Sequence, residues 1–345
     1  MMELDHLDKD SIAGEHEDIL TVQDLKAYFK FEGYGISREV RAVDGATLRV
    51  RRGEVYGLAG ESGSGKTTLV KALAGAIRPP LRVMGGSVTY NFGGGQPIDI
   101  YDPAIDVKAL RWKHLSYIMQ GSMSVLNPVR RIRQSFHDFA YRHMKLRKAA
   151  FWSAVEDHLA RLQLDRRILD SYPHQLSGGM RQRTTIALAT VCKPEFVIAD
   201  EPTTALDVIV QRDVLRMIKN VQRQQGSTMV FVTHDMSVHA TIADRVGIVY
   251  AGRLVEEAPT IDLFRAPLHP YTAHLISSLP RIGDTRARKS LPGRPPNLAD
   301  PPKGCRFHPR CPLAIEKCRH EVPPMEGPHG GNRVACWRPG EAVLT

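Results

Sequence analysis

Short apolar runs alternate along most of this chain with longer segments whose apolar residues recur at helical spacing. The runs expected to form strands are residues 45–50, 55–59, 114–120, 196–200 and 228–233. Residues 130–165 are predicted to be helical, and a second apolar stripe runs from Val210 to Val221, with Gly226 placed to stop that helix. Strands that alternate with helices predict an α/β fold with a parallel sheet covered on both faces.

The two ends of the chain differ from this middle part. Residues 1–18 are charged and lack periodicity, so we expect them to be disordered. Residues 85–101 are rich in glycine and β-forming residues, which predicts a hairpin. After about residue 258 proline becomes frequent and helical spacing fades, so we predict a domain boundary there. A chain of 345 residues is long enough for two domains.

Composition narrows the class of protein. The chain is 42% hydrophobic and carries a formal net charge of +10. No run approaches the ~20 apolar residues that a membrane-spanning helix needs. The acidic N-terminus is unlike a signal or transit peptide, so we expect a cytosolic protein unless a partner holds it at a membrane. The positive charge suggests an acidic partner (a nucleotide, a nucleic acid or anionic lipid) or simply a basic surface.

A glycine-rich loop follows the strand predicted at residues 55–59 and precedes a helix-like stretch. Its pattern is G-x-x-x-x-G-K-[ST], and strand, loop and helix form the context that a phosphate-binding loop needs. Glycines let backbone N–H groups approach a phosphate closely. Lys66 is placed to reach the β- and γ-phosphates, and Thr67 to bind Mg²⁺. The predicted nucleotide contacts are Gly60, Glu61, Ser62, Gly63, Ser64, Gly65, Lys66, Thr67 and Thr68.

Two carboxylates end one of the predicted strands. Asp200 is placed to hold Mg²⁺, directly or through water. Glu201 is expected to face the γ-phosphate and to act as general base for the attacking water. A second anion site is predicted about 20 residues earlier, where Ser177 can cap a helix and Gly178 and Gly179 leave its first N–H groups exposed. For that segment a simple capped helix is the alternative.

These motifs, in this order, resemble those of the nucleotide-binding subunit of an ABC transporter. The features are the phosphate loop, a glutamine loop at Gln120, a signature at 176–180, the carboxylate pair, a D-loop at 205–207 and a switch histidine, His234. The resemblance implies a RecA-like P-loop core with an antiparallel β subdomain over residues 19–258. It also implies a helical subdomain at about residues 120–175.

The resemblance assigns roles to single residues. Two such domains pair head to tail, so Ser177 and Gly179 of one chain would donate to the γ-phosphate held by the other. Asp207 would couple the two sites. Gln120 would contact Mg²⁺ or the attacking water, and His234 would hydrogen-bond the γ-phosphate.

Two positions leave questions open. An aromatic residue ahead of the phosphate loop should stack on adenine, and Phe29 is predicted for this role. Tyr28 and Phe31 are alternatives, and a core strand position is equally compatible with Phe29. The family signature usually ends in Gln, whereas this chain has Met180, which puts in doubt the geometry of the site that it lends to the partner.

The C-terminal part, residues 259–345, resembles the extension of the peptide/nickel/opine importer branch. The resemblance is carried by Leu-His-Pro-Tyr-Thr at 268–272 and by the segment 304–312. Four cysteines with the spacing C-x₅-C-x₆-C-x₁₇-C lie there: Cys305, Cys311, Cys318 and Cys336. Four thiolates suit Zn²⁺ or an iron–sulfur cluster. The resemblance to dipeptide and oligopeptide members implies a structural [4Fe–4S] cluster, with zinc as the alternative.

Together these expectations describe the ATP-hydrolysing subunit of an importer of small peptides. The predicted catalytic residues are Lys66, Gln120, Glu201 and His234. Expected partners are a second ATPase subunit (a copy or a paralogue), two transmembrane permease subunits and an extracytoplasmic substrate-binding protein. The chain would then lie peripherally at the cytoplasmic face of the membrane. Alternatives are another cargo (nickel, an opine or an oligosaccharide), an exporter, or a soluble ABC ATPase acting on nucleic acid, although no nucleic acid is expected as a partner.

Overall fold

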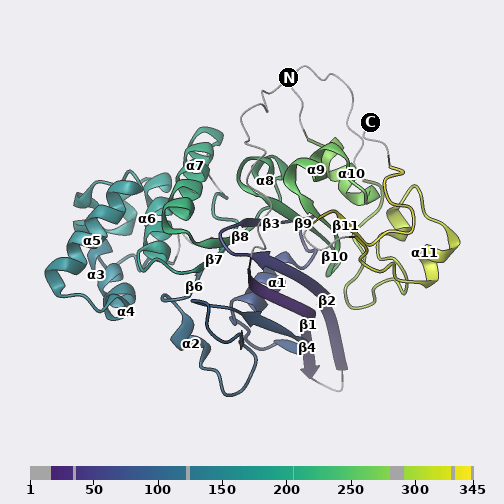
Figure 1. Ribbon diagram of the computed structural model, residues 1–345, viewed down its shortest axis with the longest axis horizontal. Helices are drawn as coiled ribbons and strands as arrows, with labels where there is room; N and C mark the ends of the chain where they lie inside the picture. The colour runs from purple at the N-terminus through teal and green to yellow at the C-terminus, as the bar shows by residue number, and fades with distance from the viewer. Residues whose placement is uncertain are drawn as a thin grey trace.

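The computed structural model of the protein describes residues 17–33, 36–121, 125–204, 206–279, 291–327 and 331–342. Two sheets organise it (Figure 1). A seven-stranded sheet has the order β11-β10-β9-β3-β8-β7-β6, and a four-stranded sheet has the order β2-β1-β4-β5. No helix in these ranges is long and apolar enough to cross a membrane.

Five neighbouring strands of the larger sheet are parallel, and the last of them, β6, forms one of its edges. They are short, apolar and almost entirely buried, as strands covered on both faces must be. They are β3 (Val55–Ala59), β6 (Leu115–Ile118), β7 (Phe196–Asp200), β8 (Thr228–Val232) and β9 (Arg245–Tyr250). Antiparallel strands β10 (Arg253–Pro259) and β11 (Arg333–Val334) extend the sheet at one edge. The predicted parallel sheet is confirmed.

The smaller sheet is antiparallel. Its strands are β1 (Asp18–Gly33), β2 (Ile36–Arg51), β4 (Leu81–Tyr90) and β5 (Ile98–Asp99). The hairpin predicted at 85–101 is confirmed, because β5 pairs antiparallel with the end of β4, Thr89 opposite Asp99. One hydrophobic cluster joins this sheet to helix α1 (Lys66–Leu73) and to the central strands. The phosphate loop is therefore fixed between two sheets.

Helices cover both sheets and form a lateral lobe, at the left of Figure 1. The helices of that lobe are α3 (Ile132–Phe136), α4 (Arg142–Met144), α5 (Lys148–Arg161) and α6 (Gly178–Thr190). The other helices are α2 (Val107–Leu110), α7 (Val208–Gln225), α8 (Met236–Ile242), α9 (Thr260–Arg265), α10 (Pro270–Ser277) and α11 (Glu316–His320). The predicted stop of α7 is confirmed, because Gly226 takes the left-handed backbone conformation at its C-terminus.

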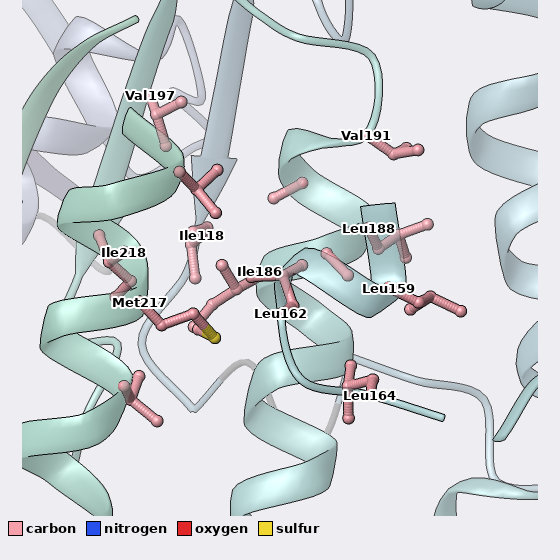
Figure 2. Packing of buried hydrophobic residues seen from close by; sticks show 14 of the residues in the cluster. Ile118, Leu159, Leu162, Leu164, Ile186, Leu188, Val191, Val197, Met217 and Ile218 are labelled. Carbon is pink, nitrogen blue, oxygen red and sulfur yellow. The ribbon is translucent and has the colours of Figure 1, made fainter. Parts of the chain in front are cut away.

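The helical lobe shares a core with the central sheet. Figure 2 shows Ile186 of α6 beside Met217 of α7 and Ile118 of β6, and Leu159 of α5 belongs to the same cluster. Each fully buried side chain of this size contributes about 1.5–3 kcal/mol through the hydrophobic effect. This packing fixes the position of the start of α6, where the second anion site is predicted.

Two predictions concern the ends of the chain: disorder over residues 1–18 and a domain boundary near residue 258. The predicted disorder of residues 1–18 falls almost wholly outside the described residues, and Asp18 already begins β1. The boundary predicted near residue 258 lies within β10. Beyond it the chain returns to the same sheet as β11, which pairs with Glu256 and Glu257 of β10. The division into domains stays a prediction.

Candidate active site

The phosphate loop leaves β3 at Gly60 and enters α1 at Lys66. Gly60 has φ +145°, and a Cβ there would lie 2.2 Å from the Val249 carbonyl oxygen. Gly65 has φ +104°, and its Cβ would lie 2.1 Å from the Ala42 carbonyl oxygen. Neither position can hold a side chain, so the glycines of the motif are required by packing as well as by the approach of a phosphate.

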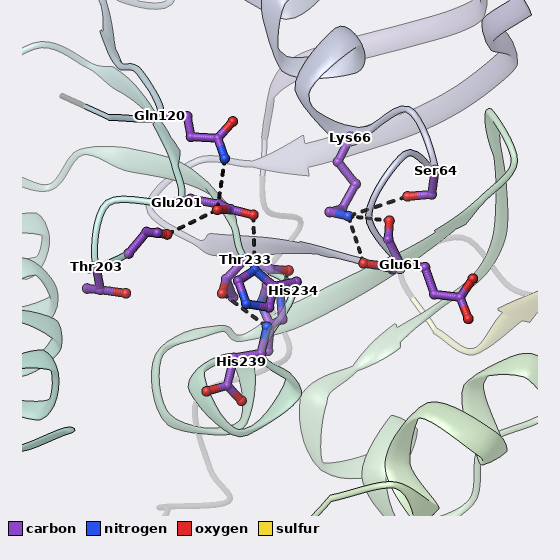
Figure 3. Close-up of polar contacts among 12 residues, drawn as sticks. Glu61, Ser64, Lys66, Gln120, Glu201, Thr203, Thr233, His234 and His239 are labelled. Atoms are coloured by element: carbon purple, nitrogen blue, oxygen red, sulfur yellow. Dashed lines mark hydrogen bonds and ion pairs between the residues drawn. The ribbon is translucent and has the colours of Figure 1, made fainter. Parts of the chain in front are cut away.

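The Lys66 amine is bound by its own loop. Its Nζ donates to the carbonyl oxygens of Gly60 at 2.7 Å and Glu61 at 2.8 Å, and to Ser64 Oγ at 3.4 Å (Figure 3). Burial lowers the pKa of Lys66, and Glu201 and Asp200 oppose that shift. The charged Lys66 amine therefore lies close to the two carboxylates, where it can stabilise a bound anion such as a phosphate.

Asp200 is the inner carboxylate at the end of β7. It is fully buried, and its Oδ2 accepts a hydrogen bond from the Tyr117 hydroxyl at 3.2 Å. Its Oδ1 has no hydrogen-bond partner in the described part of the chain. Burial raises the pKa of Asp200, partly offset by Tyr117 and by the Thr67 hydroxyl. An orphaned carboxylate oxygen beside the Thr67 hydroxyl fits the oxygen ligand set that Mg²⁺ prefers.

Glu201 is the outer carboxylate and has three side-chain partners. Gln120 Nε2 donates to it at 3.1 Å, the Thr204 hydroxyl at 3.0 Å, and His234 Nδ1 lies 3.1 Å away (Figure 3). Burial alone would raise the pKa of Glu201, but the bonds from His234 and Thr204 outweigh it and lower the pKa. The carboxylate is therefore ionised and available to accept a proton.

The parallel strands explain why these residues meet. Gln120, Glu201 and His234 follow the carboxyl ends of β6, β7 and β8, which lie at one edge of the sheet, next to the end of β3. Glu201 has φ +50°, an unusual conformation for a residue with a side chain. Strain of this kind gathers at functional sites, where the surrounding structure enforces it.

The second predicted anion site has the geometry of a capped helix. Ser177 Oγ accepts from the Met180 N–H at 3.3 Å at the start of α6. No contact closer than 4 Å would meet a Cβ on Gly178, whereas a Cβ on Gly179 would lie 3.0 Å from Val210. Asp207 caps α7 by accepting from the N–H groups of Ile209 and Val210. Ala205, in the predicted D-loop, lies outside the described residues.

The remaining predicted nucleotide contacts are placed as follows. Ser62 and Gly63 are exposed in the loop, and Thr68 is buried in α1. Phe29 lies half-buried on β1, stacked on Phe31 at 6.4 Å between ring centroids. Tyr28 is buried and donates to Asp44, so it is committed to the core. The adenine-stacking role of Phe29 stays a prediction.

The predicted four-cysteine metal centre is wrong. Cys305, Cys311, Cys318 and Cys336 are free thiols that line one cavity of only about 10 Å³, room for roughly one water and not for a four-iron cluster. Within the described residues, no group of three or more His, Cys, Asp or Glu side chains is arranged to hold a metal ion. Burial raises the pKa of Cys305 to about 11, so this thiol stays protonated. The prediction failed because the spacing of cysteines along the chain does not determine how much room lies between their thiols.

Sequence reasoning missed two residues of the site. Tyr117 holds Asp200, and Thr204 holds Glu201. Tyr117 lies near the end of β6, three positions before the predicted Gln120, and this nearness to the strand end was the available signal. Thr204 is three positions after Glu201, at the separation of a turn.

A groove opens beside the site, between α1, β6 and the helical lobe. Its cavity volume is about 820 Å³. The apolar side chains of Met119, Val125 and Phe139 line it and are each more than 40% exposed. Phe139 stacks on Trp112, with ring centroids 5.5 Å apart. Exposed apolar surface gathered in one groove marks a site for a partner.

Comparison with known proteins agrees with this geometry. The ABC transporter family matches residues 43–204, and the oligopeptide/dipeptide transporter C-terminal region matches residues 255–318. The chain is 37% identical to the dipeptide transport ATP-binding protein DppD of Caldanaerobacter subterraneus, over 92% of this chain and 96% of that protein. It is 38% identical to the oligopeptide transport ATP-binding proteins OppD of Salmonella typhimurium and Escherichia coli, over 94% of this chain and 95% of each.

Solved structures share the fold. A dimeric ATP-binding cassette in a post-hydrolysis state with ADP and phosphate superposes with a TM-score of 0.59 at 22% identity, covering 70% of this chain and 98% of that chain. A second dimeric structure, titled as a bacterial ABC transporter cassette, gives the same values. The chain therefore belongs to the ABC transporter ATP-binding family, in the group that carries the oligopeptide/dipeptide transporter C-terminal region.

Proposed function

We propose that this chain is the ATP-hydrolysing subunit of a transporter that imports small peptides. The observation that carries the proposal is the position of Glu201. Its ionised carboxylate is held by three side chains, and the carboxylate itself interacts electrostatically with Lys66 of a complete phosphate loop. The names of relatives at about 38% identity, which are dipeptide and oligopeptide transport ATP-binding proteins, support peptides over nickel, opines or oligosaccharides.

Each residue of the site has a separate role in the hydrolysis of ATP. Lys66 exchanges its contacts with the loop carbonyls for the β- and γ-phosphates, and His234 holds the γ-phosphate. Glu201 takes a proton from water, whose oxygen then bonds to the γ-phosphorus while the bond to the β–γ bridging oxygen breaks, leaving ADP and phosphate. Asp200, Thr67 and Gln120 would hold Mg²⁺, which neutralises charge on the phosphates when bound.

A second ATPase subunit completes the site. Ser177, Gly178 and Gly179 present N–H groups and a hydroxyl at the start of α6, which is the chemistry that binds a phosphate. Asp207 would contact the partner across the same interface. Head-to-tail pairing, of this chain with a copy or with a paralogue, would bring that helix start to the γ-phosphate held by the other subunit.

Permease subunits fit the apolar groove that Met119, Val125 and Phe139 line. Because Gln120 follows β6 beside this groove and contacts Glu201, a partner seated there would be coupled to the catalytic carboxylate. Two permeases, with an extracytoplasmic protein that supplies the peptide, would hold the chain peripherally at the cytoplasmic face of the membrane.

Reconstitution of the whole transporter tests the proposal. ATP hydrolysis is measured in vesicles with the binding protein loaded with a dipeptide, an oligopeptide, nickel, an opine or an oligosaccharide. We expect stimulation by a peptide and uptake of that peptide at the expense of ATP. Stimulation by nickel or a sugar alone would reassign the cargo, and hydrolysis without any membrane partner at the full stimulated rate would overturn the transport function.

A further inference from the structure

The phosphate loop is contacted by the C-terminal extension (residues 259–345). Arg310 donates from Nη1 to Glu61 Oε2 at 2.8 Å and from Nη2 to Glu61 Oε1 at 3.0 Å. The Arg310 side chain is 6% exposed, and its Nε donates to the Pro292 carbonyl oxygen at 3.0 Å. A buried guanidinium in this two-pronged geometry holds a carboxylate at a fixed distance and angle, which a surface ion pair does not.

Tyr271 of the same extension holds the backbone of Glu61. The Glu61 N–H donates to the Tyr271 hydroxyl oxygen at 2.8 Å. The Tyr271 ring is fully buried and packs against Tyr250 and Phe307, with centroids 4.7 and 5.5 Å away. His269 Nδ1 accepts from the Tyr271 N–H at 3.0 Å and fixes the first turn of α10. The hydroxyl therefore sits at the end of a rigid support.

Glu61 is consequently bound at each of its polar groups. Its carbonyl oxygen accepts from Lys66, its N–H is bound by Tyr271 and its carboxylate by Arg310. Figure 3 shows the Glu61 carboxylate pointing away from Lys66, toward the yellow ribbon of the C-terminal extension. Glu61 thus has little freedom, although the next two residues of the loop, Ser62 and Gly63, are exposed.

Charge gives the Arg310 contact a second effect. Glu61 is a carboxylate inside a loop whose ligand is a triphosphate, and like charges at short range repel. Arg310 cancels the Glu61 charge and directs the carboxylate away from the Lys66 amine. Without Arg310 the loop would present one uncompensated negative charge next to the phosphates.

A neighbouring contact braces the other side of the loop. The Gly252 N–H, in the turn between β9 and β10, donates to the Ser64 carbonyl oxygen at 2.7 Å. Arg306 of the extension is buried and donates to the Ala251 carbonyl oxygen in that turn and to Asp44. The extension therefore contacts the phosphate loop directly through Arg310 and Tyr271, and indirectly through the turn that Arg306 holds.

We propose that Arg310 and Tyr271 are positioning residues for ATP, because they fix Glu61 and remove its charge from the phosphate site. This inference rests on the ATPase function proposed above and adds a role for the C-terminal extension. Neither residue contacts the reacting atoms. Their loss therefore weakens nucleotide binding and leaves the chemical step, at saturating ATP, close to that of the wild type.

Equilibrium binding of ATP with Mg²⁺ to the full-length chain tests the proposal. We expect Arg310→Ala to raise the Kd for ATP about tenfold, the scale of a lost charge-assisted hydrogen bond. Tyr271→Phe removes only the hydroxyl and should raise it about threefold. In the assembled transporter, KM for ATP should rise in parallel while kcat stays within about twofold.

The double variant Glu61→Gln/Arg310→Ala tests whether the loss of ATP affinity comes from the unpaired Glu61 charge or from the missing Arg310 side chain. It should recover most of the lost affinity, because no charge is left unpaired. The control is Arg338→Ala, which removes an arginine of the same extension and should leave the Kd unchanged. The ion pair of Arg338 among the described residues is with the exposed Glu341.

A Kd for Arg310→Ala within twofold of the wild type would overturn the proposal, as would a double variant as weak as the single one. If Arg310→Ala does not fold, Tyr271→Phe decides, and an unchanged Kd there is the contrary result. A wild-type transporter that no peptide stimulates, with Kd shifts as expected, would instead refute the cargo and leave this inference standing.

Discussion

Glu201 is held by more partners than a solvated carboxylate at a strand end needs. Gln120, Thr204 and His234 contact it, and its backbone keeps a left-handed conformation that costs energy. The three contacts fix where the carboxylate points, and those from His234 and Thr204 keep it ionised. A general base requires both properties.

Replacing Glu201 by Gln should separate binding from turnover. The amide cannot take a proton, so we expect kcat to fall about 10²–10⁴-fold while ATP affinity is retained. The assay measures phosphate release and nucleotide binding on the same preparation. Glu195→Gln, at the opposite end of β7, is the matched control and should leave kcat nearly unchanged; equal loss in both variants would remove Glu201 from this role.

Gly57, in β3 ahead of the phosphate loop, is required for a different reason. A Cβ at this position would lie 2.5 Å from Nδ1 of the fully buried His239. We expect Gly57→Ala to lower the free energy of unfolding by about 1–3 kcal/mol, the usual cost of overpacking. Chemical denaturation measures this value. Gly85→Ala on β4, where a Cβ meets nothing within 4 Å, should cost far less.

At this scale, sequence predicts what a local motif dictates. The phosphate loop and the Asp200–Glu201 pair lie at strand ends, as the short apolar run before each motif predicted, and their roles stay predictions. The cysteines were misread as a metal centre because spacing cannot tell whether four thiols converge as ligands. Arg310 carries no local signal, since its partner Glu61 belongs to another part of the chain.

Among the elements, α7 shows how one residue can serve two purposes. Asp207 caps the helix by accepting from two N–H groups, and it also heads the segment expected to face a second subunit. Val208 and Ile209, the first residues of the helix, are 80% and 70% exposed. Large apolar side chains this exposed beside the site suit a surface that a partner covers.

Two substitutions at Asp207 should separate these purposes. Asp207→Ala removes the cap and should lower the free energy of unfolding by about 1 kcal/mol, whereas Asn caps nearly as well as Asp. Asp207→Asn should therefore keep its stability but lose coupled hydrolysis in the assembled transporter. Denaturation and ATPase rates measure the two effects. Full turnover by the Asn variant would show that the carboxylate does not act across the interface.

The groove beside β6 belongs to the same scale, because two elements and the helical lobe form it. A charge placed there should prevent the permease from seating, so Phe139→Asp should abolish co-purification with the membrane subunits. ATP binding by the chain itself should persist. Leu146→Asp, an exposed apolar position in the lobe outside the groove, is the control. Normal assembly of Phe139→Asp would place the permease contact elsewhere.

For the whole molecule, three buried histidines lower the stability of the fold in acid, and the buried Glu54, whose pKa burial raises to about 7, offsets part of that loss. Burial lowers the pKa of His158 to about 4, of His239 to about 4 and of His269 to about 3. An unfolded histidine binds a proton near pH 6.5. The folded state therefore binds fewer protons than the unfolded state between about pH 6.5 and 4, so stability is present above this range and is lost as pH falls through it.

We accordingly expect the free energy of unfolding to fall by about 1.4 kcal/mol per pH unit for each of these histidines below pH 6. Denaturation at a series of pH values measures the slope. His158→Gln, which removes one titrating group, should make the slope shallower. An equal slope in the wild type and in His158→Gln would contradict the burial of the His158 ring.

The overall architecture was predictable where neighbours in sequence are neighbours in space. Alternating strands and helices indicated the parallel sheet, and the glycine at residue 226 indicated the end of α7. The pairing of β11 with β10 was not predictable, because two residues of strand carry no periodicity and their partners are 76 and 78 positions earlier. Contacts of this kind join the C-terminal extension to the sheet and the phosphate loop.

The bond between Glu61 and Arg310 also sets an order of events during synthesis, because 249 positions separate the two residues. A ribosome adds about 5–20 residues per second, so the loop exists for on the order of ten seconds or more before its arginine is made. Throughout that interval the nascent chain has the whole motif and an uncompensated Glu61. On the proposed role of Arg310, full affinity for ATP is therefore acquired only after residue 310 has emerged.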